Sequence, residues 1–357
     1  MCTTHEAGPP APLAAAAAPD REWAGEALPL DPVDSVAVTT VCDNAIDIFL
    51  PDEGPARRRL GRLGGAPTVV AATLDGGRGV DLPRAEHGFS VHVAVTKGGR
   101  THEMLFDTGV SPGGCRDNLA RLGLEVVEIE AIVLSHGHFD HTTGLSGLAA
   151  ALGRANLPVV LHPEFWSRRR IAVPGEEPLE LPSTSRRALT DAGFEVVENR
   201  RPSFLFHRSV LVTGEVDRTT PFETGFPVHE AWRGGSWEPD PLILDDQAFI
   251  ANVAGKGLVV ISGCGHAGIV NICRYARRLT GVDRIYAVIG GFHLSGRLFE
   301  PVIVPTCDAL AELDPEVIVP THCTGWKAVH ELAARFPDRF LQSSVGTTFL
   351  LESPQAA

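Results

Sequence analysis

The stretch Ser135-His136-Gly137-His138-Phe139-Asp140-His141 indicates both the fold and the chemistry of this chain. It follows the apolar residues 131–134, which are predicted to form a buried strand. A strand-to-helix turn of this composition presents imidazole nitrogens and a carboxylate oxygen to a common point. Zinc and related divalent metals bind this mixture of nitrogen and oxygen donors. We therefore predict a metal centre that includes His136, His138, Asp140 and His141.

The composition excludes several classes of protein. The chain has 357 residues, 44 acidic against 31 basic side chains, and a formal net charge of −13. This acidic balance argues against a general nucleic-acid binder, which needs a basic face for phosphates. No apolar run reaches the ~18 residues of a membrane helix, so we expect no membrane partner. The seven cysteines are widely spaced and form no C-x-x-C pair, which indicates a reduced, cytoplasmic protein.

The alternation of predicted strands and helices, without an internal repeat, favours one α/β or α+β domain. The main strands are expected at residues 35–40, 104–106, 131–134, 249–253, 258–262, 287–289 and 317–319. The main helices are expected at residues 117–124, 269–279, 309–313 and 326–336. We expect this domain to span residues 31–357, after a disordered tail over residues 1–30.

Residues 165–240 interrupt the alternation, with seven prolines, many arginines, Trp232 and Trp237. Long irregular stretches inside a compact domain are usually functional lids or disordered insertions. We predict an insertion that covers the metal cleft and sets substrate choice without building the metal site. The alternative is a surface segment that packs on the sandwich and does not contact the ligand.

The H-x-H-x-D-H pattern after a buried strand resembles the metallo-β-lactamase superfamily. A second match is Leu105-Phe106-Asp107-Thr108-Gly109, which is similar to the strand-end D-T-G of that superfamily. The resemblance extends over roughly residues 35–350. It implies an α+β fold, the four-layer αββα metallo-β-lactamase sandwich, with one or two metal ions at one edge. It also implies that Asp107 supports a ligand histidine from behind; the alternative is a turn-forming role.

Further motifs are similar to one branch of this superfamily, the dihydropterin-ribofuranosyl-aminobenzene-phosphate synthase-like proteins. Each motif alone is weak, and the set is specific because the motifs occur in order. They are Cys42-Asp43-Asn44, Glu86-His87-Gly88-Phe89-Ser90, Asp245-Asp246-Gln247-Ala248, Ser262-Gly263-Cys264-Gly265-His266-Ala267-Gly268, Gly290-Gly291-Phe292-His293-Leu294 and Pro320-Thr321-His322-Cys323-Thr324-Gly325.

Two of these motifs supply further predicted ligands. His266 lies just after a predicted strand, at the glycine-lined entry to a helix whose N-terminus favours negative charge; a helix-capping role is the alternative. His322 lies where the superfamily's last ligand histidine is expected. His87 and His293 are candidates for substrate binding, with a core or capping role as the alternative.

The chain also departs from the common superfamily pattern. A typical member has a histidine in a G-H turn and then a bridging aspartate. The corresponding places here hold Asp245 and Asp246, and then Cys264. The bridge is therefore the Cys264 thiolate, an aspartate such as Asp246, or absent, and Cys264 as a buried structural residue is a further alternative. We expect one or two divalent ions, with zinc first and manganese or iron as alternatives.

These residues predict a metal-dependent hydrolase that acts on an ester, thioester or phosphoester of a small anionic molecule. The reaction would use a metal-bound hydroxide, and Asp140 would orient it or accept its proton as the catalytic residue. One alternative is a pterin-related synthase that uses the metal as a Lewis acid. Another is a non-catalytic ligand-sensing module, against which the complete histidine motif argues. The sequence does not indicate an oligomeric state.

Overall fold

The computed structural model describes residues 25–58, 67–153 and 155–355. Most of the tail predicted over residues 1–30 lies outside the described residues. Residues 25–30 are described, and the Leu28 amide donates a hydrogen bond to the Leu279 carbonyl oxygen (2.6 Å) while Leu30 is buried. The prediction that the disordered tail extends to residue 30 is therefore wrong at its end, because Leu28 and Leu30 pack against the core of the domain.

The first main sheet has seven strands. Six of them lie in the order β13 (Ser203–Leu205), β14 (Val210–Val212), β17 (Phe249–Val253), β18 (Gly257–Ser262), β19 (Ile285–Gly291) and β20 (Val317–Thr321), and β1 (Pro32–Val33) pairs with β17. Strands β18, β19 and β20 are parallel. Helices α5 (Ile269–Thr280), α6 (Ile303–Leu313) and α7 (Trp326–Arg335) follow these three strands in turn. The carboxyl ends of the three strands therefore meet at one edge.

The second main sheet has eight strands. Their order is β12 (Glu195–Glu198), β9 (Pro158–Leu161), β8 (Ala131–Val133), β7 (Arg100–Phe106), β6 (Ser90–Lys97), β2 (Ser35–Cys42), β21 (Thr347–Glu352) and β3 (Ala56–Arg58). Strands β7, β8, β9 and β12 are parallel. Three helices lie between β7 and β9 in the sequence: α1 (Gly114–Arg121), α2 (Phe139–Thr142) and α3 (Leu145–Leu152).

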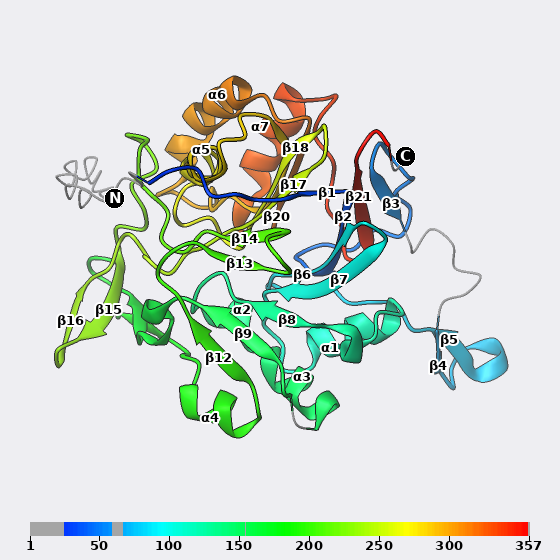
Figure 1. The fold of residues 1–357 in the computed structure, drawn as a ribbon. Helices are drawn as coiled ribbons and strands as arrows, with labels where there is room; N and C mark the ends of the chain where they lie inside the picture. The colour runs from blue at the N-terminus through cyan, green and yellow to red at the C-terminus, as the bar shows by residue number, and fades with distance from the viewer. Residues whose placement is uncertain (1–24, 59–66, 154, 356–357) are drawn as a thin grey trace, which may run out of the picture.

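Figure 1 shows the two main sheets between α5, α6 and α7 on one side and α1 and α3 on the other, and three apolar cores lie between these layers. Between the sheets, Val91 and Phe106 of the second sheet pack in one core with Phe249 and Ile289 of the first. A second core joins the first sheet to α5, α6 and α7, and a third joins the second sheet to α1 and α3. Three cores separate four layers, so the structure confirms the predicted αββα sandwich.

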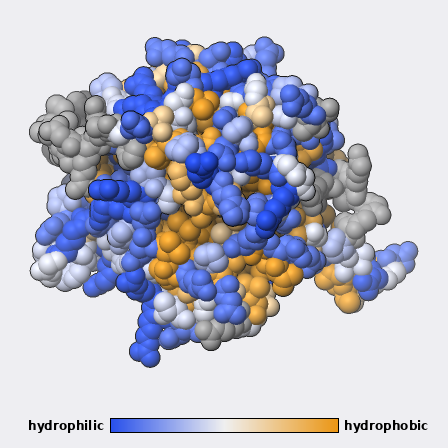
Figure 2. Space-filling view, in the orientation of Figure 1, coloured by the Kyte–Doolittle hydropathy of each residue, from blue (hydrophilic) through white to orange (hydrophobic). Residues whose placement is uncertain are grey.

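Figure 2 shows that hydrophobic residues on this face gather over the middle of the molecule, where Figure 1 places the two sheets. Hydrophilic residues cover much of the rest of the face. In the part of the chain that the structure describes, no helix is both long and apolar enough to cross a membrane.

Residues 165–240 do not form the single insertion that their composition predicts. They supply β12 to the second main sheet and β13 and β14 to the first. The remaining strands form a separate four-stranded sheet in the order β11 (Leu179–Leu181), β10 (Arg169–Ile171), β15 (His229–Arg233) and β16 (Ser236–Pro239). Helix α4 (Arg186–Asp191) lies in the same segment, and β4 (Thr68–Val70) pairs with β5 (Arg78–Val80) elsewhere. Most of these strands have only three or four residues, too few for a clear alternating pattern.

The core between the two sheets can be tested at Phe249, which is fully buried in β17. We expect Phe249→Ala to lower the free energy of unfolding by about 3–5 kcal/mol, because it leaves a cavity between the sheets. The matched control is Phe49→Ala, since Phe49 is 89% exposed and should change stability by less than about 0.5 kcal/mol. Urea unfolding measures both, and equal effects would contradict the assignment of this core.

Candidate metal centre

The predicted ligands come together at the sheet edge where β8, β18 and β20 end. His136 and His138 follow β8, Cys264 and His266 follow β18, and His322 follows β20. Among the described residues, three groups of side chains have ligand atoms that all lie within 4.8 Å of one another within the group, and one of them, Cys264, His266 and His293, shares two residues with the other two groups. The three-histidine group consists of His136, His138 and His266, and the Cys264 group consists of Asp140, His141, Cys264 and His322.

The three-histidine group is arranged around Nδ1 of His138. This atom lies 2.9 Å from His136 Nε2 and 3.2 Å from His266 Nε2. A ring nitrogen carries one proton or one lone pair, so it cannot make a good hydrogen bond to both neighbours. Two nitrogens bound to one tetrahedral zinc ion at 2.0–2.1 Å lie about 3.3–3.4 Å apart. The spacing of the three buried nitrogens therefore fits a shared divalent ion.

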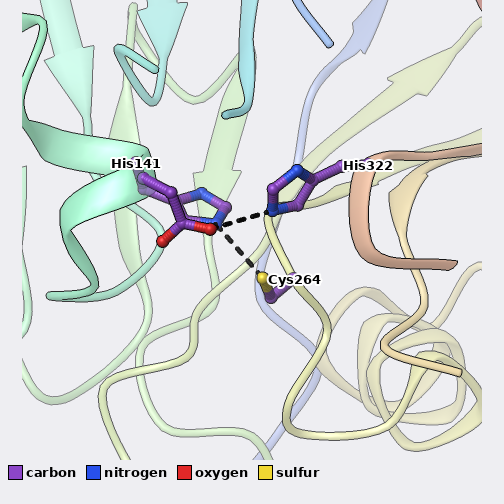
Figure 3. A group of neighbouring side chains, drawn as sticks. His141, Cys264 and His322 are labelled. Carbon is purple, nitrogen blue, oxygen red and sulfur yellow. Dashed lines mark hydrogen bonds and ion pairs between the residues drawn. The ribbon is translucent and has the colours of Figure 1, made fainter. Parts of the chain in front are cut away.

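The Cys264 group offers oxygen, nitrogen and sulfur donors. His141 Nε2 lies 3.1 Å from Cys264 Sγ, and His322 Nε2 lies 3.3 Å from Asp140 Oδ2. Figure 3 shows His141, Cys264 and His322 pointing toward one another from different parts of the fold. Both ring nitrogens of His322 are buried without a hydrogen-bond partner. An ion bound here would satisfy one of them, and zinc accepts this mixture of donors.

The buried carboxylate of Asp107 is hydrogen-bonded to residues of both groups, directly to His141 and through the Ser135 hydroxyl to His136. Its Oδ2 accepts hydrogen bonds from His141 Nδ1 (2.7 Å) and from the Ser135 hydroxyl (2.7 Å). The same hydroxyl lies 2.9 Å from His136 Nδ1. These contacts place the Nδ1 protons of His136 and His141 on the outer side, so that each Nε2 faces inward as the atom that a metal ion would bind. Such outer hydrogen bonds fix the tautomer and orientation of ligand histidines.

A glycine makes this arrangement sterically feasible. A Cβ atom on Gly263 would lie 2.0 Å from the Ser135 hydroxyl oxygen and 2.7 Å from Asp107 Oδ2. Any larger residue at the end of β18 would displace the support of the histidines. The two sheets approach each other so closely at this edge that only glycine fits at position 263 without displacing Ser135 or Asp107.

The electrostatic environment differs between the two groups. Burial, together with the charge of neighbouring histidines, holds the pKa of His136, His138 and His266 well below the ordinary value. Burial also disfavours a charged His141, but the carboxylates of Asp107 and Asp140 outweigh it and raise its pKa to about 9. Burial raises the pKa of the Cys264 thiol. At neutral pH the three-histidine group is thus unprotonated, whereas the Cys264 group holds protons that a metal ion would displace.

Asp246 lies outside both groups. Its Oδ2 accepts a hydrogen bond from the Ala267 amide (2.7 Å), and burial raises its pKa to about 7. The N-terminus of α5 differs from the prediction as well, because Glu223 accepts hydrogen bonds from the amides of Val270 and Asn271. The negative charge favoured by this helix end is therefore supplied by the protein itself.

Of the two predicted substrate-side histidines, His87 lies beside the Cys264 group, whereas His293 is itself a possible metal ligand in a group with Cys264 and His266. His87 is exposed, and its ring centre lies 5.1 Å from that of His322. The ring centre of His293 lies 4.2 Å from that of His266. His293 also lines a pocket with an aromatic wall formed by Phe222, Phe292 and Phe299. Both positions are compatible with contact to a ligand of the metal centre.

Sequence reasoning missed residues of the 165–240 segment that contact the centre. His229 Nε2 lies 3.0 Å from His138 Nε2. Arg169 is buried and forms an ion pair with Asp245, whose other oxygen accepts a hydrogen bond from the Gly137 amide (2.8 Å). The segment therefore contacts a predicted ligand, although none of its residues belongs to a donor group found among the described residues, and its role as a cover of the metal cleft stays a prediction. No local motif marks His229, because the pairing of β15 with β10 brings it there.

Comparisons with known proteins agree with this geometry. The sequence model of the metallo-beta-lactamase superfamily matches residues 88–279. The 7,8-dihydropterin-6-methyl-4-(beta-D-ribofuranosyl)-aminobenzene-5'-phosphate synthase of Methanocaldococcus jannaschii is 30% identical over 269 residues, which is 73% of this chain and 89% of that protein. An uncharacterised protein of the same organism is 30% identical over 254 residues, 70% of this chain and 88% of that protein.

Among solved structures, that of Tm1679, a metal-dependent hydrolase of the beta-lactamase superfamily, has the same fold. The TM-score is 0.64 at 23% identity, and the match covers 89% of this chain and all of the other.

The different protonation of the two groups predicts different pH dependences of metal binding. Above about pH 6.5 the first zinc ion should bind with nearly constant affinity, because the three-histidine group releases no proton. The affinity for the second ion should rise over the whole range from pH 6 to 9, by about tenfold per pH unit for each proton displaced, because the pKa of His141 is about 9 and that of the Cys264 thiol is raised above its ordinary value. Competition with a chromophoric chelator from pH 6 to 9 measures both steps. Equal pH slopes for the two ions would contradict the assignment.

Proposed function

Since the chain belongs to the metallo-β-lactamase superfamily, we propose that it is a metal-dependent hydrolase of an ester, thioester or phosphoester in a small anionic molecule. The observation that carries this proposal is the adjacency of two complete donor groups at one sheet edge. The three-histidine group and the Cys264 group would hold one or two divalent ions, zinc first and manganese or iron as alternatives. Such ions supply Lewis acidity and an activated nucleophile near neutral pH.

Asp140 is the residue best placed to act on the nucleophile. Its side chain is 13% exposed, whereas those of His141 and His322 are fully buried. Burial opposes ionisation of Asp140, but the charges of His141 and His322 keep its pKa well below the ordinary value. A carboxylate of low pKa is a weak base, so Asp140 would orient the nucleophile rather than store its proton.

The surroundings of the donor groups favour a substrate of mixed character. Bound ions bring positive charge to the site, which favours an anionic substrate. The pocket beside His266 and His293 is walled by Phe222, Phe292 and Phe299, which suits an apolar part of the same molecule. We propose no nucleic-acid or membrane partner. The six described cysteines are free thiols, which supports a reducing compartment such as the cytoplasm.

A second candidate is the synthase activity named for the M. jannaschii relative. In this reaction a pterin that carries a leaving group on its 6-methyl carbon would be joined to a ribosylated aminobenzene phosphate: the new bond forms at that carbon as the leaving group departs, and the metal would act as a Lewis acid. The 30% identity over most of both chains favours this candidate, but fold transfers between relatives more reliably than substrate. A non-catalytic sensing module is disfavoured because the donor groups are complete.

One screen separates these candidates. The metal-loaded protein is incubated with phosphoesters, thioesters and lactones, and separately with a ribofuranosyl-aminobenzene phosphate plus a reduced pterin whose 6-methyl carbon carries a leaving group such as diphosphate. Mass spectrometry identifies the products. Metal-dependent cleavage supports the hydrolase, whereas a coupled pterin product without cleavage of the other compounds supports the synthase. Absence of any turnover in both arms would favour the sensing module.

Metal binding can be tested at the three-histidine group. We expect the wild-type protein to hold at least one transition-metal ion per chain and the His136→Ala/His138→Ala variant to lose that ion, because two of its three nitrogen donors are gone. Elemental analysis gives the metal content. The control is His102→Ala, since His102 is buried against the Glu130 carboxylate and belongs to neither donor group. Full metal content in the double variant would overturn the proposed site.

The role of Asp140 can be tested with Asp140→Asn, which keeps an oxygen acceptor and removes the charge. We expect turnover of an identified substrate to fall by roughly 10²–10⁴, because the neutral amide no longer orients the nucleophile through a charged hydrogen bond. The assay is run at saturating metal, and metal content is measured in parallel because Asp140 also belongs to the Cys264 group. Unchanged turnover would remove Asp140 from the mechanism.

A further inference from the structure

We propose that His229 and Asp240 form a buried hydrogen-bond relay on the Nε2 side of His138. This relay fixes the tautomer of His138 that binds a metal ion. His229 is thereby a positioning residue, supplied by the 165–240 segment. The proposal rests on the proposed function only in taking the three-histidine group as a metal site.

The two nitrogens of His138 face different partners. Nδ1 faces His136 and His266, at 2.9 and 3.2 Å. Nε2 faces the other way, toward His229 Nε2 at 3.0 Å. Two imidazole nitrogens this close share one proton, so either His138 or His229 is the donor. Which of them donates decides the state of Nδ1 in His138.

The hydrogen bond of the other ring nitrogen of His229, Nδ1, decides which of the two residues donates. Its Nδ1 lies 3.0 Å from the backbone carbonyl oxygen of Asp240, which can only accept a hydrogen bond. Nδ1 of a neutral His229 therefore carries the proton, and its Nε2 carries the lone pair. His138 must then donate from Nε2, which leaves the Nδ1 lone pair facing the other two histidines. This tautomer binds metal, whereas the opposite one would direct a proton at the ion.

The relay is held rigidly at its outer end. His229 is fully buried, and its backbone carbonyl accepts a hydrogen bond from the Asp240 amide (2.9 Å), since both residues lie at the open end of the β15–β16 hairpin. The Asp240 carboxylate accepts a hydrogen bond from Arg233 (2.9 Å). On the other side, the ring of Phe226 is stacked against both His229 and His266. Rotation of the His229 ring would break contacts on both of its sides.

A direct role of His229 as a metal ligand fits the geometry less well. Its Nε2 faces the nitrogen of His138 that points away from His136 and His266, and His229 belongs to none of the donor groups found among the described residues. The expected effect of its loss is therefore a weaker site rather than an absent one. Removal of the hydrogen-bond partner of a ligand histidine typically lowers metal affinity by 10–100-fold.

The test compares His229→Ala, His229→Gln and the control His102→Ala. In each protein the dissociation constant of the first zinc ion is measured by chelator competition. We expect His229→Ala to raise this constant by about 10–100-fold. The glutamine oxygen of His229→Gln can accept from His138 and its amide can donate to the Asp240 carbonyl, so this variant should stay within about threefold of wild type. The control should match wild type.

A second measurement does not depend on any variant folding. Long-range ¹H–¹⁵N NMR spectra of wild-type protein report which nitrogen of each histidine carries the proton. We expect the proton of His138 on Nε2 and that of His229 on Nδ1, both with and without zinc. A proton on Nδ1 of His138 in the metal-free protein would overturn the relay, as would unchanged zinc affinity in His229→Ala or equal losses in the Gln and Ala variants.

These outcomes are separable from failure of the proposed function. A wild-type protein that binds zinc and shows the predicted tautomers, but cleaves no ester, would refute the hydrolase proposal and leave the relay intact. A wild-type protein that binds no zinc at the three-histidine group would refute both.

Discussion

The buried carboxylate of Asp107 is the constraint on which the metal centre depends. A fully buried carboxylate is costly unless every oxygen is hydrogen-bonded. Here the donors are the Ser135 amide and hydroxyl and the ring of His141. These donors belong to the turn that carries the metal ligands, so the requirement to satisfy one carboxylate also fixes the conformation of that turn. Asp107 itself adopts a left-handed backbone conformation (φ 61°), a strained state for a non-glycine residue that its surroundings must maintain.

Much of the fold and many of the candidate metal ligands could be predicted from the sequence, because the patterns that indicate them lie within short segments. The run of histidines after an apolar strand, the D-T-G turn and the apolar strands β17, β18 and β20 lie in short segments whose pattern suffices. The sequence also placed His266 and His322 among the candidate ligands, and the structure brings both to the predicted edge. For Cys264 and Asp246 alternatives stayed open, and their surroundings differ: Cys264 lies in a donor group, whereas Asp246 accepts a hydrogen bond from the Ala267 amide.

The part of the site that the sequence did not predict depends on contacts between segments that are far apart in the chain. His229 is 91 residues from His138 and lies in a segment whose prolines and short strands resemble a loop. Only the pairing of β15 with β10, and the ion pair of Arg169 with Asp245, brings that segment against the histidine turn. A Cβ atom on Gly137 would lie 2.2 Å from the Phe165 carbonyl oxygen, which shows how closely the two backbones approach. Such a contact leaves no periodic pattern in either segment.

The loop after β18 links the two donor groups covalently. Cys264 belongs to the Cys264 group and His266 to the three-histidine group, with only Gly265 between them, and both also form a further donor group with His293. A Cβ atom on Gly265 would lie 2.6 Å from the Gly291 carbonyl oxygen, so the loop is pressed against the end of β19. Its other side is held by Arg218, which donates a hydrogen bond to the His266 carbonyl oxygen (3.1 Å). Displacement of this loop would therefore move a ligand of each group at once. The positions of the two groups are therefore coupled through this loop, although their protonation at neutral pH differs.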